Sequence, residues 1–340
     1  MSTDLKHNLP QTADGNSAVY VIHENEEWLI PLREAFKELD VPYEEWFINE
    51  GSLSLDDVPP DGVFYNRMSA SSHTRSHQYA VELTGPVLAW LENHGRRVVN
   101  GRRALQLEIR KFEQYLSLQK HDITTPKTIA ATGKDEILKA AHLLDQTPFI
   151  LKPNRGGKGQ GVELFRTIEE LEKRLEEKSE LSLDGISLVQ QYIKPHNDTI
   201  TRLEFIGGKF FYGVQVDTSE GFELCPADSC AVGEEFCPAP GDDPKHKFTI
   251  LDDFRDSDLI SRLENFFAAN DIEVGAAEFV ENENGERFVY DININTNYNR
   301  QAEINAGDKK KAMLEVARFL GEELENATDD HQEVAQGIPV

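Results

Sequence analysis

Apolar runs alternate with amphipathic segments through the first hundred residues of the chain. The predicted strands are short runs of β-branched and aromatic residues at 19–22, 43–48, 62–65 and 97–100. The predicted helices carry apolar residues at helical spacing and cover 27–39 and 78–94. This alternation predicts a small α/β domain over residues 18–101. Residues 1–17 are polar and mixed, and we expect them to be disordered.

The pattern changes after residue 101, where further helices and antiparallel hairpins are predicted. Helical spacing indicates helices at 101–118, 134–144, 167–178, 258–269 and 309–320. Apolar runs indicate strands at 149–151, 162–165, 187–193, 202–206 and 209–216. Gly207 and Gly208 are typical of a two-residue hairpin turn between the last two strands. The chain ends in an acidic segment at 323–340, which we expect to be a loose tail.

A second hairpin is predicted at 276–299, AAEFVENENGERFVYDININTNYN, and one of its faces is polar. Its first strand carries Glu278. Its return strand places Asp291, Asn293 and Asn295 at a spacing of two, and therefore on one face. These side chains suit a hard cation such as Mg²⁺, which takes oxygen ligands and keeps phosphate oxygens and water in its other positions. The alternative is a solvated hairpin whose polar residues face water.

A glycine-rich segment, KPNRGGKGQG, follows the strand predicted at 149–151. Gly156, Gly157 and Gly159 let the backbone approach a ligand without hindrance from Cβ, and its N–H groups can line a polyphosphate. Three residues add positive charge where phosphates would lie: Lys152, Arg155 and Lys158. The segment is not a Walker loop, because it lacks the Gly-Lys-Ser/Thr ending. The alternative is a glycine-rich hairpin without a ligand.

The loop at 66–77 follows a predicted strand and contains two arginines, Arg67 and Arg75. Loops beyond strand ends are where α/β domains bind ligands, and the arginine fork suits a carboxylate or a phosphate. We therefore predict that Arg67 and Arg75 hold a carboxylate or a phosphate. His73 and His77 are weaker candidates, and a solvated surface loop is the alternative.

Composition excludes several classes of protein. A net charge of −26 argues against binding nucleic acid through its phosphates, although an ATP site needs only a few local basic residues. Three cysteines are too few for a disulfide framework, and their spacing, with His246, matches no zinc finger, so the roles of Cys225, Cys230 and Cys237 stay open. Without a signal pattern or a membrane-length apolar run, we expect a cytoplasmic protein with no membrane partner. The sequence is compatible with a homo-oligomer.

Four motifs follow one another between about residues 100 and 311. They are EIRKFEQYLSLQKHDITTP, FILKPNRGGKGQGV, LVQQYIKP, and the pair AAEFV and DININTN. In this order they resemble the ATP-grasp superfamily and, within it, the RimK-like carboxylate–amine ligases. The resemblance implies an α/β (α+β) protein with the ATP-grasp fold. Residues 18–101 would be its small N-terminal pre-ATP-grasp domain, 102–186 the small subdomain with the phosphate loop, and 187–322 the C-terminal subdomain with the metal site.

The resemblance also implies roles for particular residues. For ATP it implies Lys111, Lys152, Arg155, Gly156, Gly157, Gly159, Gln190, Gln191, Tyr192 and Ile193. For two Mg²⁺ ions, or Mn²⁺ in their place, it implies Glu278, Asp291 and Asn293. Members of the family usually carry basic residues that face the acyl phosphate at the end of one strand. This chain has Gln215-Val216-Asp217 at that place. Arg202 and Arg300 are the nearest substitutes for that catalytic role.

The reaction that the resemblance implies is ATP-dependent formation of an amide bond. The γ-phosphate of ATP activates a carboxylate as an acyl phosphate, and an amine then displaces the phosphate. The substrates would be a small-molecule or peptide carboxylate and an amine. Arg67 and Arg75, or alternatively Arg202 and Arg300, would hold the acid. The alternatives are a non-catalytic ATP-binding regulatory protein and a different ATP-grasp enzyme, such as a D-alanine-type or glutathione-type ligase or a kinase.

Overall fold

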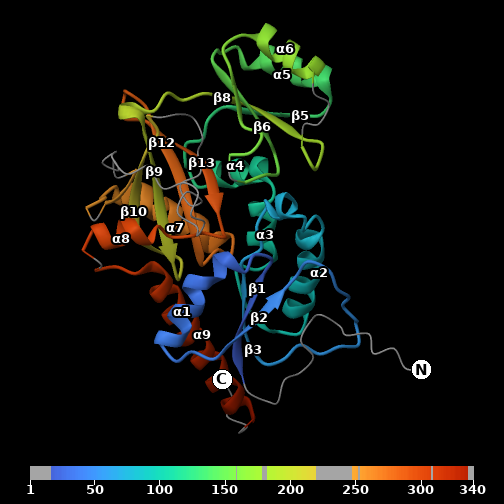
Figure 1. Cartoon of the computed structure of the whole chain (residues 1–340), viewed down its shortest axis with the longest axis vertical. Coiled ribbons are helices and arrows are strands. Elements are labelled where there is room, and N and C mark those ends of the chain that lie inside the picture. The colour runs from blue at the N-terminus through green and yellow to red at the C-terminus, as the bar shows by residue number, and fades with distance from the viewer. Residues whose placement is uncertain are drawn as a thin grey trace, which may run out of the picture.

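The computed structural model describes residues 17–157, 159–177, 182–219, 247–251, 253–307 and 309–335, and three sheets organise them (Figure 1). Parts of the sequence predictions lie outside the described residues. They are residues 1–16 of the N-terminus, Lys158, the three cysteines with His246, and residues 336–340. No helix in the described part of the chain is long and apolar enough to cross a membrane.

A four-stranded parallel sheet in the order β2-β1-β3-β4 forms the N-terminal domain. Its strands are β1 (Ala18–His23), β2 (Tyr43–Phe47), β3 (Gly62–Asn66) and β4 (Arg97–Val99). Its helical segments are η1 (Glu27–Leu29), α1 (Ile30–Glu38), η2 (Ser72–Arg75) and α2 (Ala80–Asn93). Parallel strands are buried on both faces, which explains the unbroken apolar run of β1. Val19 and Val21 pack toward α1 and the C-terminal helix α9 (Ala312–Ala335), whereas Tyr20 packs toward α2.

A small antiparallel sheet in the order β5-β8-β6-β7 lies, with its two helices, at the end of the molecule farthest from α9 (Figure 1). Its elements are β5 (Thr128–Ala131), α5 (Lys134–Leu144), β6 (Phe149–Pro153), β7 (Glu163–Phe165), α6 (Ile168–Glu177) and β8 (Ser187–Gln191). Side chains alternate along β6. Phe149 and Leu151 pack under α5 and α6, whereas Ile150 and Lys152 face a cavity on the other side.

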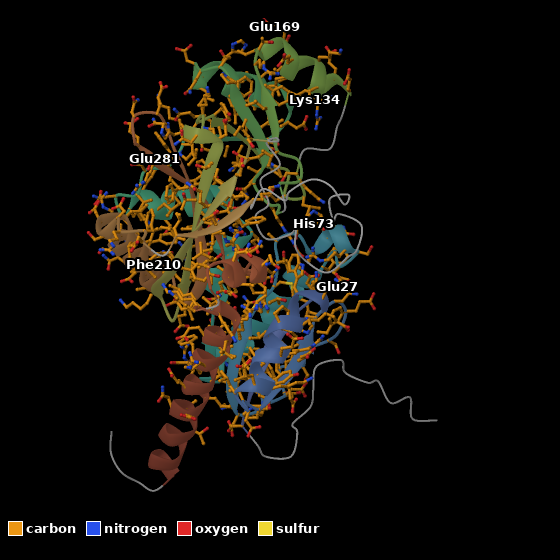
Figure 2. The ribbon with its side chains drawn as sticks, turned by 60° about the vertical axis from the view of Figure 1, so that its left-hand side comes forward. Glu27, His73, Lys134, Glu169, Phe210 and Glu281 are labelled. Carbon is orange, nitrogen blue, oxygen red and sulfur yellow. The ribbon has the colours of Figure 1, made fainter. Side chains whose placement is uncertain are left out.

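A five-stranded antiparallel sheet in the order β11-β10-β9-β12-β13 lies between these two parts. Its strands are β9 (Thr199–Ile206), β10 (Lys209–Asp217), β11 (Phe248–Leu251), β12 (Val274–Glu281) and β13 (Arg287–Asn293). Helix α7 (Ser257–Ala269) packs on its apolar face, where Leu203, Ala277 and Ile292 are buried. The short η3 (His196–Asp198) precedes β9, and α8 (Arg300–Asn305) follows β13. Figure 2 shows Phe210 and Glu281 at opposite ends of this sheet.

The hairpin predicted at Gly207-Gly208 joins β9 to β10. Both glycines have positive φ, 59° and 69°. This is the backbone conformation that a type I′ turn requires and that glycine adopts without strain. The hairpin predicted at 276–299 is the β12–β13 pair, with a bulge after Glu278.

The helix predicted at 101–118 is in fact two helices, α3 (Arg102–Glu108) and α4 (Lys111–Gln119). The first N–H groups of α4 are satisfied by the end of β6: Lys111 donates to the main-chain oxygen of Asn154 at 3.1 Å and Phe112 to its Oδ1 at 3.0 Å. These contacts begin a new helix where the apolar periodicity alone indicated a continuous one.

Two further differences concern segment boundaries. Strand β8 pairs with β5 and β6, so it belongs to the small sheet, whereas the sequence division placed it at the start of 187–322. The tail predicted as loose continues α9 as far as Ala335. Leu320, Leu324 and Ala327 extend the apolar stripe of that helix, and the stripe packs against the N-terminal domain.

Candidate active site

A cavity of about 360 Å³ opens between the small sheet and the large sheet. It brings together most of the residues to which the sequence analysis assigned a role. They are Lys111, Lys152, Gly156, Gly157, Gly159, Gln190, Gln191, Tyr192, Ile193, Arg202, Glu278, Asp291 and Asn293. Four predicted arginines do not line the cavity: Arg67, Arg75, Arg155 and Arg300.

Glu278, Asp291 and Asn293 lie on the cavity side of β12 and β13. Glu278 is directly opposite Asp291 in the antiparallel register. Asn293 Nδ2 donates to Glu278 Oε1 at 3.3 Å, which leaves its Oδ1 for another partner. Two carboxylates and an amide oxygen fit the preference of Mg²⁺ for oxygen ligands. The described residues form no group of three His, Cys, Asp or Glu side chains able to hold a metal, so Mg²⁺ here would also rely on phosphate oxygens and water.

Glu278 is buried and strongly oriented. Its Oε1 accepts from Arg202 Nη1 at 2.9 Å, and its Oε2 accepts from the Tyr290 hydroxyl at 3.0 Å. Burial raises the pKa of Glu278, against the opposing effect of the Arg202 charge. Arg202 therefore supplies the positive charge that this buried carboxylate requires in the absence of a cation.

Helix α4 covers the open edge of β13 and thereby positions Lys111. Gln114 Nε2 donates to the main-chain oxygen of Ile292 at 2.9 Å, and the Ile292 N–H donates back to Gln114 Oε1 at 3.2 Å. This reciprocal pair satisfies the strand edge as a neighbouring strand would. Lys111 Nζ, at the start of the helix, forms an ion pair with Asp291. Burial acts to lower the pKa of Lys111, but Asp291, Tyr115 and Glu108 together outweigh it and the net change is upward.

Lys152 has a different environment. It is 7% exposed, and its Nζ donates to the Tyr115 hydroxyl at 2.6 Å. Tyr115 in turn donates to the main-chain oxygen of Tyr290 at 2.8 Å. Burial, followed by the nearby charge of Lys111, lowers the pKa of Lys152 to about 7. Lys152 therefore changes charge near neutral pH, where an arriving anion would shift it to the ammonium form.

Nucleotide binding should take up a proton at Lys152. Phosphate oxygens favour the ammonium form, so binding raises the pKa of Lys152 from about 7 and the complex holds more protons than the free protein. We expect the affinity for a non-hydrolysable ATP analogue to fall by roughly tenfold between about pH 8 and 9. Titration calorimetry in buffers of different ionisation enthalpy measures the uptake. Lys152→Met should bind more weakly and without that uptake; an unchanged uptake in this variant would contradict the assignment.

The glycine-rich loop lines the cavity and rests on the N-terminal domain. A Cβ added at Gly157 would lie 3.2 Å from Ser71 Cβ, so glycine permits this close approach. Arg155, which we expected at the phosphates, forms an ion pair with Glu82 on α2. Its Nη2 also lies 3.3 Å from Glu82 Oε2. The contact joins the loop to the N-terminal domain.

The end of β8 carries Gln190 and Gln191, two of the residues predicted to bind ATP. Gln191 accepts from the Lys127 N–H through its Oε1 at 3.1 Å, and Gln190 Nε2 donates to Thr128 Oγ1 at 2.7 Å. Both amide side chains are therefore held by β5 and the residue before it. Ile150 lies opposite Gln190 in the register and adds an apolar surface to the same wall of the cavity. A polar strand end beside an apolar wall suits a planar base.

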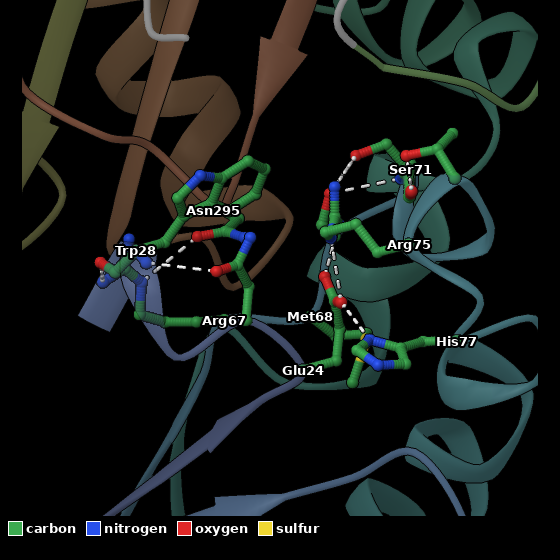
Figure 3. Close-up of polar contacts among 12 residues, drawn as sticks. Glu24, Trp28, Arg67, Met68, Ser71, Arg75, His77 and Asn295 are labelled. Carbon is green, nitrogen blue, oxygen red and sulfur yellow. Dashed lines mark hydrogen bonds and ion pairs between the residues drawn. The ribbon is translucent and has the colours of Figure 1, made fainter. Parts of the chain in front are cut away.

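Figure 3 shows that Arg67 and Arg75 are the centres of two separate polar clusters. Arg67 is buried and donates to Asn295, Asn297 and two main-chain oxygens. Arg75 pairs with Glu24, donates to Ser71 Oγ at 3.2 Å and lies over the Trp28 ring at 4.6 Å. Both arginines thus stand behind residues that line the cavity.

The two arginines predicted for catalysis have different positions. Arg202 lines the cavity and is buried between Glu204, at 2.6 Å, and Glu278, at 2.9 Å. Arg300 begins α8 outside the cavity, has a half-exposed side chain and lies 3.4 Å from Glu303.

Sequence reasoning assigned no role to several other residues that line the cavity. These are Trp28, Ser69, Ser71, Glu108 and Asn297. Asn297 continues the two-residue spacing of Asp291, Asn293 and Asn295, and this spacing could have identified it. Trp28 and the serines come from the N-terminal domain, and no pattern around them indicates that they meet the large sheet.

Comparisons with known proteins agree with this architecture. Residues 110–223 match the model of the RimK-like ATP-grasp domain. That segment contains both lysines and the glycine-rich loop, and it ends before the hairpin that carries Glu278 and Asp291. A D-alanine–D-alanine ligase from Maridesulfovibrio salexigens is 30% identical over 151 residues, 41% of this chain and 49% of the ligase. The match thus spans about half the length of that relative.

Solved structures share the fold over nearly the whole chain. A RimK domain ATP-grasp protein from Sphaerobacter thermophilus has a TM-score of 0.60 at 18% identity and covers 91% of this chain and 99% of its own. D-alanyl-alanine synthetase A from Vibrio cholerae has a TM-score of 0.63 at 14% identity, with 92% and 99% covered. The chain therefore shares the ATP-grasp fold of these structures. Its residues 110–223 are similar to the RimK-like ATP-grasp domain, as the four sequence motifs predicted.

Proposed function

We propose that the chain is an ATP- and Mg²⁺-dependent ligase that joins a carboxylate to an amine through an acyl phosphate. The observation that carries this proposal is the convergence of Lys111, Lys152, Glu278 and Asp291 on one cavity that the glycine-rich loop also lines. Phosphoryl transfer relies mainly on positioning and on stabilising the charge of the phosphoryl oxygens. Bound Mg²⁺, held by the two carboxylates and Asn293, would neutralise part of that charge.

The two lysines have distinct roles in this proposal. Lys152 becomes fully charged as phosphate oxygens arrive and then stabilises the charge that develops on them. Lys111 is already charged against Asp291 and lies where it can exchange that partner for a phosphate oxygen. A carboxylate oxygen of the acid attacks the γ-phosphorus and ADP leaves. The amine then attacks the acyl carbon, loses a proton, and phosphate departs with the oxygen that attacked.

The acid in this proposal is an amino acid or a peptide. Support comes from the similarity to a D-alanine–D-alanine ligase and to D-alanyl-alanine synthetase A. The apolar wall at Ile150 and the amides at the end of β8 form the base-binding part of the cavity, so the acid lies on the other side of the lysines.

The experiment is to measure ADP release with Mg²⁺ and ATP against amino acids and dipeptides, offered singly and in pairs, with mass spectrometry on the products. The proposal predicts release that needs both an acid and an amine, and a product lighter than the two together by one water. A phosphorylated single substrate would indicate a kinase instead. Bound ATP with no release from any pair would contradict a ligase for these substrates.

A further inference from the structure

A polar surface of the cavity lies beside Glu278, Asp291 and Asn293, the residues predicted to hold Mg²⁺. Asn295 and Asn297 continue the chain past Asn293 and line the cavity together with Ser69 and Ser71. Asn295 follows Asn293 by two residues, in the bend just after β13, and both side chains line the same cavity. A carboxylate that attacks a γ-phosphorus placed near Asp291 would lie close to this surface.

Arg67 fixes the orientation of both amides, and Figure 3 shows it beside Asn295. Its Nε donates to Asn295 Oδ1 at 3.1 Å, and its Nη2 donates to Asn297 Oδ1 at 2.8 Å. The two oxygens occupy the arginine fork in the way that the two oxygens of a carboxylate usually do. Each amide must therefore turn its NH₂ group away from Arg67. Neither Nδ2 atom donates to another residue in the described part of the chain.

Arg67 itself has no counter-charge among the residues that the structure describes. Its side chain is buried, and its other two contacts are main-chain oxygens, of Trp28 at 3.2 Å and Thr296 at 3.0 Å. All four acceptors are neutral. A buried charge without an opposite charge is unfavourable. The field of Arg67 also polarises the amides of Asn295 and Asn297, so their NH₂ groups become stronger hydrogen-bond donors on the side away from Arg67. This arrangement favours an anion in the cavity.

The serine pair contributes another donor. Ser69 Oγ and Ser71 Oγ lie 2.9 Å apart and share one hydrogen. Ser71 Oγ accepts from Arg75 at 3.2 Å, and Ser69 Oγ accepts from the Ser71 N–H at 3.2 Å. One hydroxyl hydrogen is therefore left over, whichever serine carries it. Glu108, the acidic residue beside them, accepts from the N–H groups of Ile294 at 3.0 Å and Ala70 at 3.4 Å.

Resting on the proposed function, we propose that Asn295, Asn297 and the serine pair bind the carboxylate of the acid substrate, with Arg67 as the positioning residue. Two amide NH₂ groups and one hydroxyl meet the two oxygens of a carboxylate as donors. The same surface disfavours the neutral carboxamide, because its NH₂ group would face donors. The sequence placed Arg67 and Arg75 directly on the acid; the geometry points to their acting through the asparagines and Ser71.

The test compares acids with their carboxamides on the full chain loaded with Mg²⁺ and AMP-PNP. Acetate is titrated against acetamide, and D- and L-alanine against their alaninamides, by NMR and by thermal shift. We expect the carboxylates to bind and the carboxamides to bind at least about tenfold more weakly. Nucleotide loading is measured first, so a failure to bind AMP-PNP would count against the proposed function and not against this subsite.

Asn295→Asp and Asn297→Asp are the informative variants, because each keeps an oxygen for Arg67 and replaces the cavity-facing donor by an acceptor. Each should weaken carboxylate binding by about tenfold to a hundredfold at unchanged AMP-PNP affinity. Their melting temperatures should stay the same or rise, since Arg67 gains a counter-charge. Asn284→Asp, in the exposed turn between β12 and β13, is the matched control and should change nothing. Arg67→Lys should weaken carboxylate binding alone.

Three results would each overturn the subsite. The first is equal binding of acids and carboxamides. The second is no response to any carboxylate by the nucleotide-loaded wild type. The third is retained carboxylate affinity in both aspartate variants, which would leave the asparagines with the purely structural role of anchoring Arg67.

Discussion

Replacing Asp291 by asparagine should lower turnover by about a thousandfold or more while the fold stays intact. Asp291 faces Glu278 across the β12–β13 pair and forms an ion pair with Lys111. Asparagine has the same shape but removes the charge, so a bound cation would lose one of its two carboxylate ligands. ATP should still bind, although weakly, through the lysines and the wall of the cavity.

Steady-state ADP release and calorimetry with and without Mg²⁺ test this prediction. The variant should bind nucleotide with little dependence on Mg²⁺, whereas the wild type should depend on it strongly. Asp253→Asn is the matched control, because Asp253 is exposed and its ion pair is with the exposed Arg255. Turnover of Asp291→Asn within about tenfold of the wild type would show that Asp291 holds no catalytic cation.

Replacing Arg202 by methionine should cost about 3–5 kcal/mol of unfolding free energy. Arg202 is 4% exposed and lies between two buried carboxylates, Glu204 and Glu278. Methionine fills much of its volume but leaves both carboxylates without their counter-charge. Urea denaturation measures the loss. The matched control is Arg255→Met, since that side chain is 83% exposed and should lose little.

The instability of Arg202→Met should also depend on pH. Burial raises the pKa of Glu204 and of Glu278, and loss of the guanidinium raises both further. A carboxyl whose folded pKa lies above its unfolded value favours the folded state at low pH, and this contribution is lost as the pH rises through the folded pKa. The unfolding free energy that Arg202→Met loses should therefore become smaller as the pH falls. A loss of unfolding free energy that does not change with pH would mean that the variant is destabilised by lost packing and not by unpaired carboxylates.

Local patterns were sufficient to predict much of this protein. The periodicity of Asp291 and Asn293, with Glu278 on the paired strand, needs only the alternation of side chains along strands, and the structure places all three on one cavity. The order of motifs predicted the ATP-grasp fold, which the structural comparisons confirm. Lys111 is a case where the pattern was incomplete. Its helix begins at Lys111 because the main-chain oxygen of Asn154 accepts the Lys111 N–H, a contact across 43 residues that periodicity does not show.

The arginines show which part of the site could not be predicted from the sequence: the partners of its charged side chains. From sequence, Arg67 has a free fork suited to a substrate acid, but folding brings Asn295 and Asn297 onto that fork. Arg155 likewise sits among glycines suited to phosphate, yet its partner is Glu82 from another domain. An arginine binds whichever acceptor the tertiary structure places beside it. Its residue type indicates the chemistry of the partner but not the partner's identity.

The most direct test of the account is oxygen transfer from the acid to phosphate. An acid labelled with ¹⁸O in its carboxylate is incubated with ATP, Mg²⁺ and the amine that supports turnover. Activation as an acyl phosphate predicts that the released phosphate carries one labelled oxygen and that the amide keeps the other. Unlabelled phosphate formed alongside the amide would contradict carboxylate activation by ATP, and with it the reaction proposed for the cavity that Lys111, Lys152, Glu278 and Asp291 share.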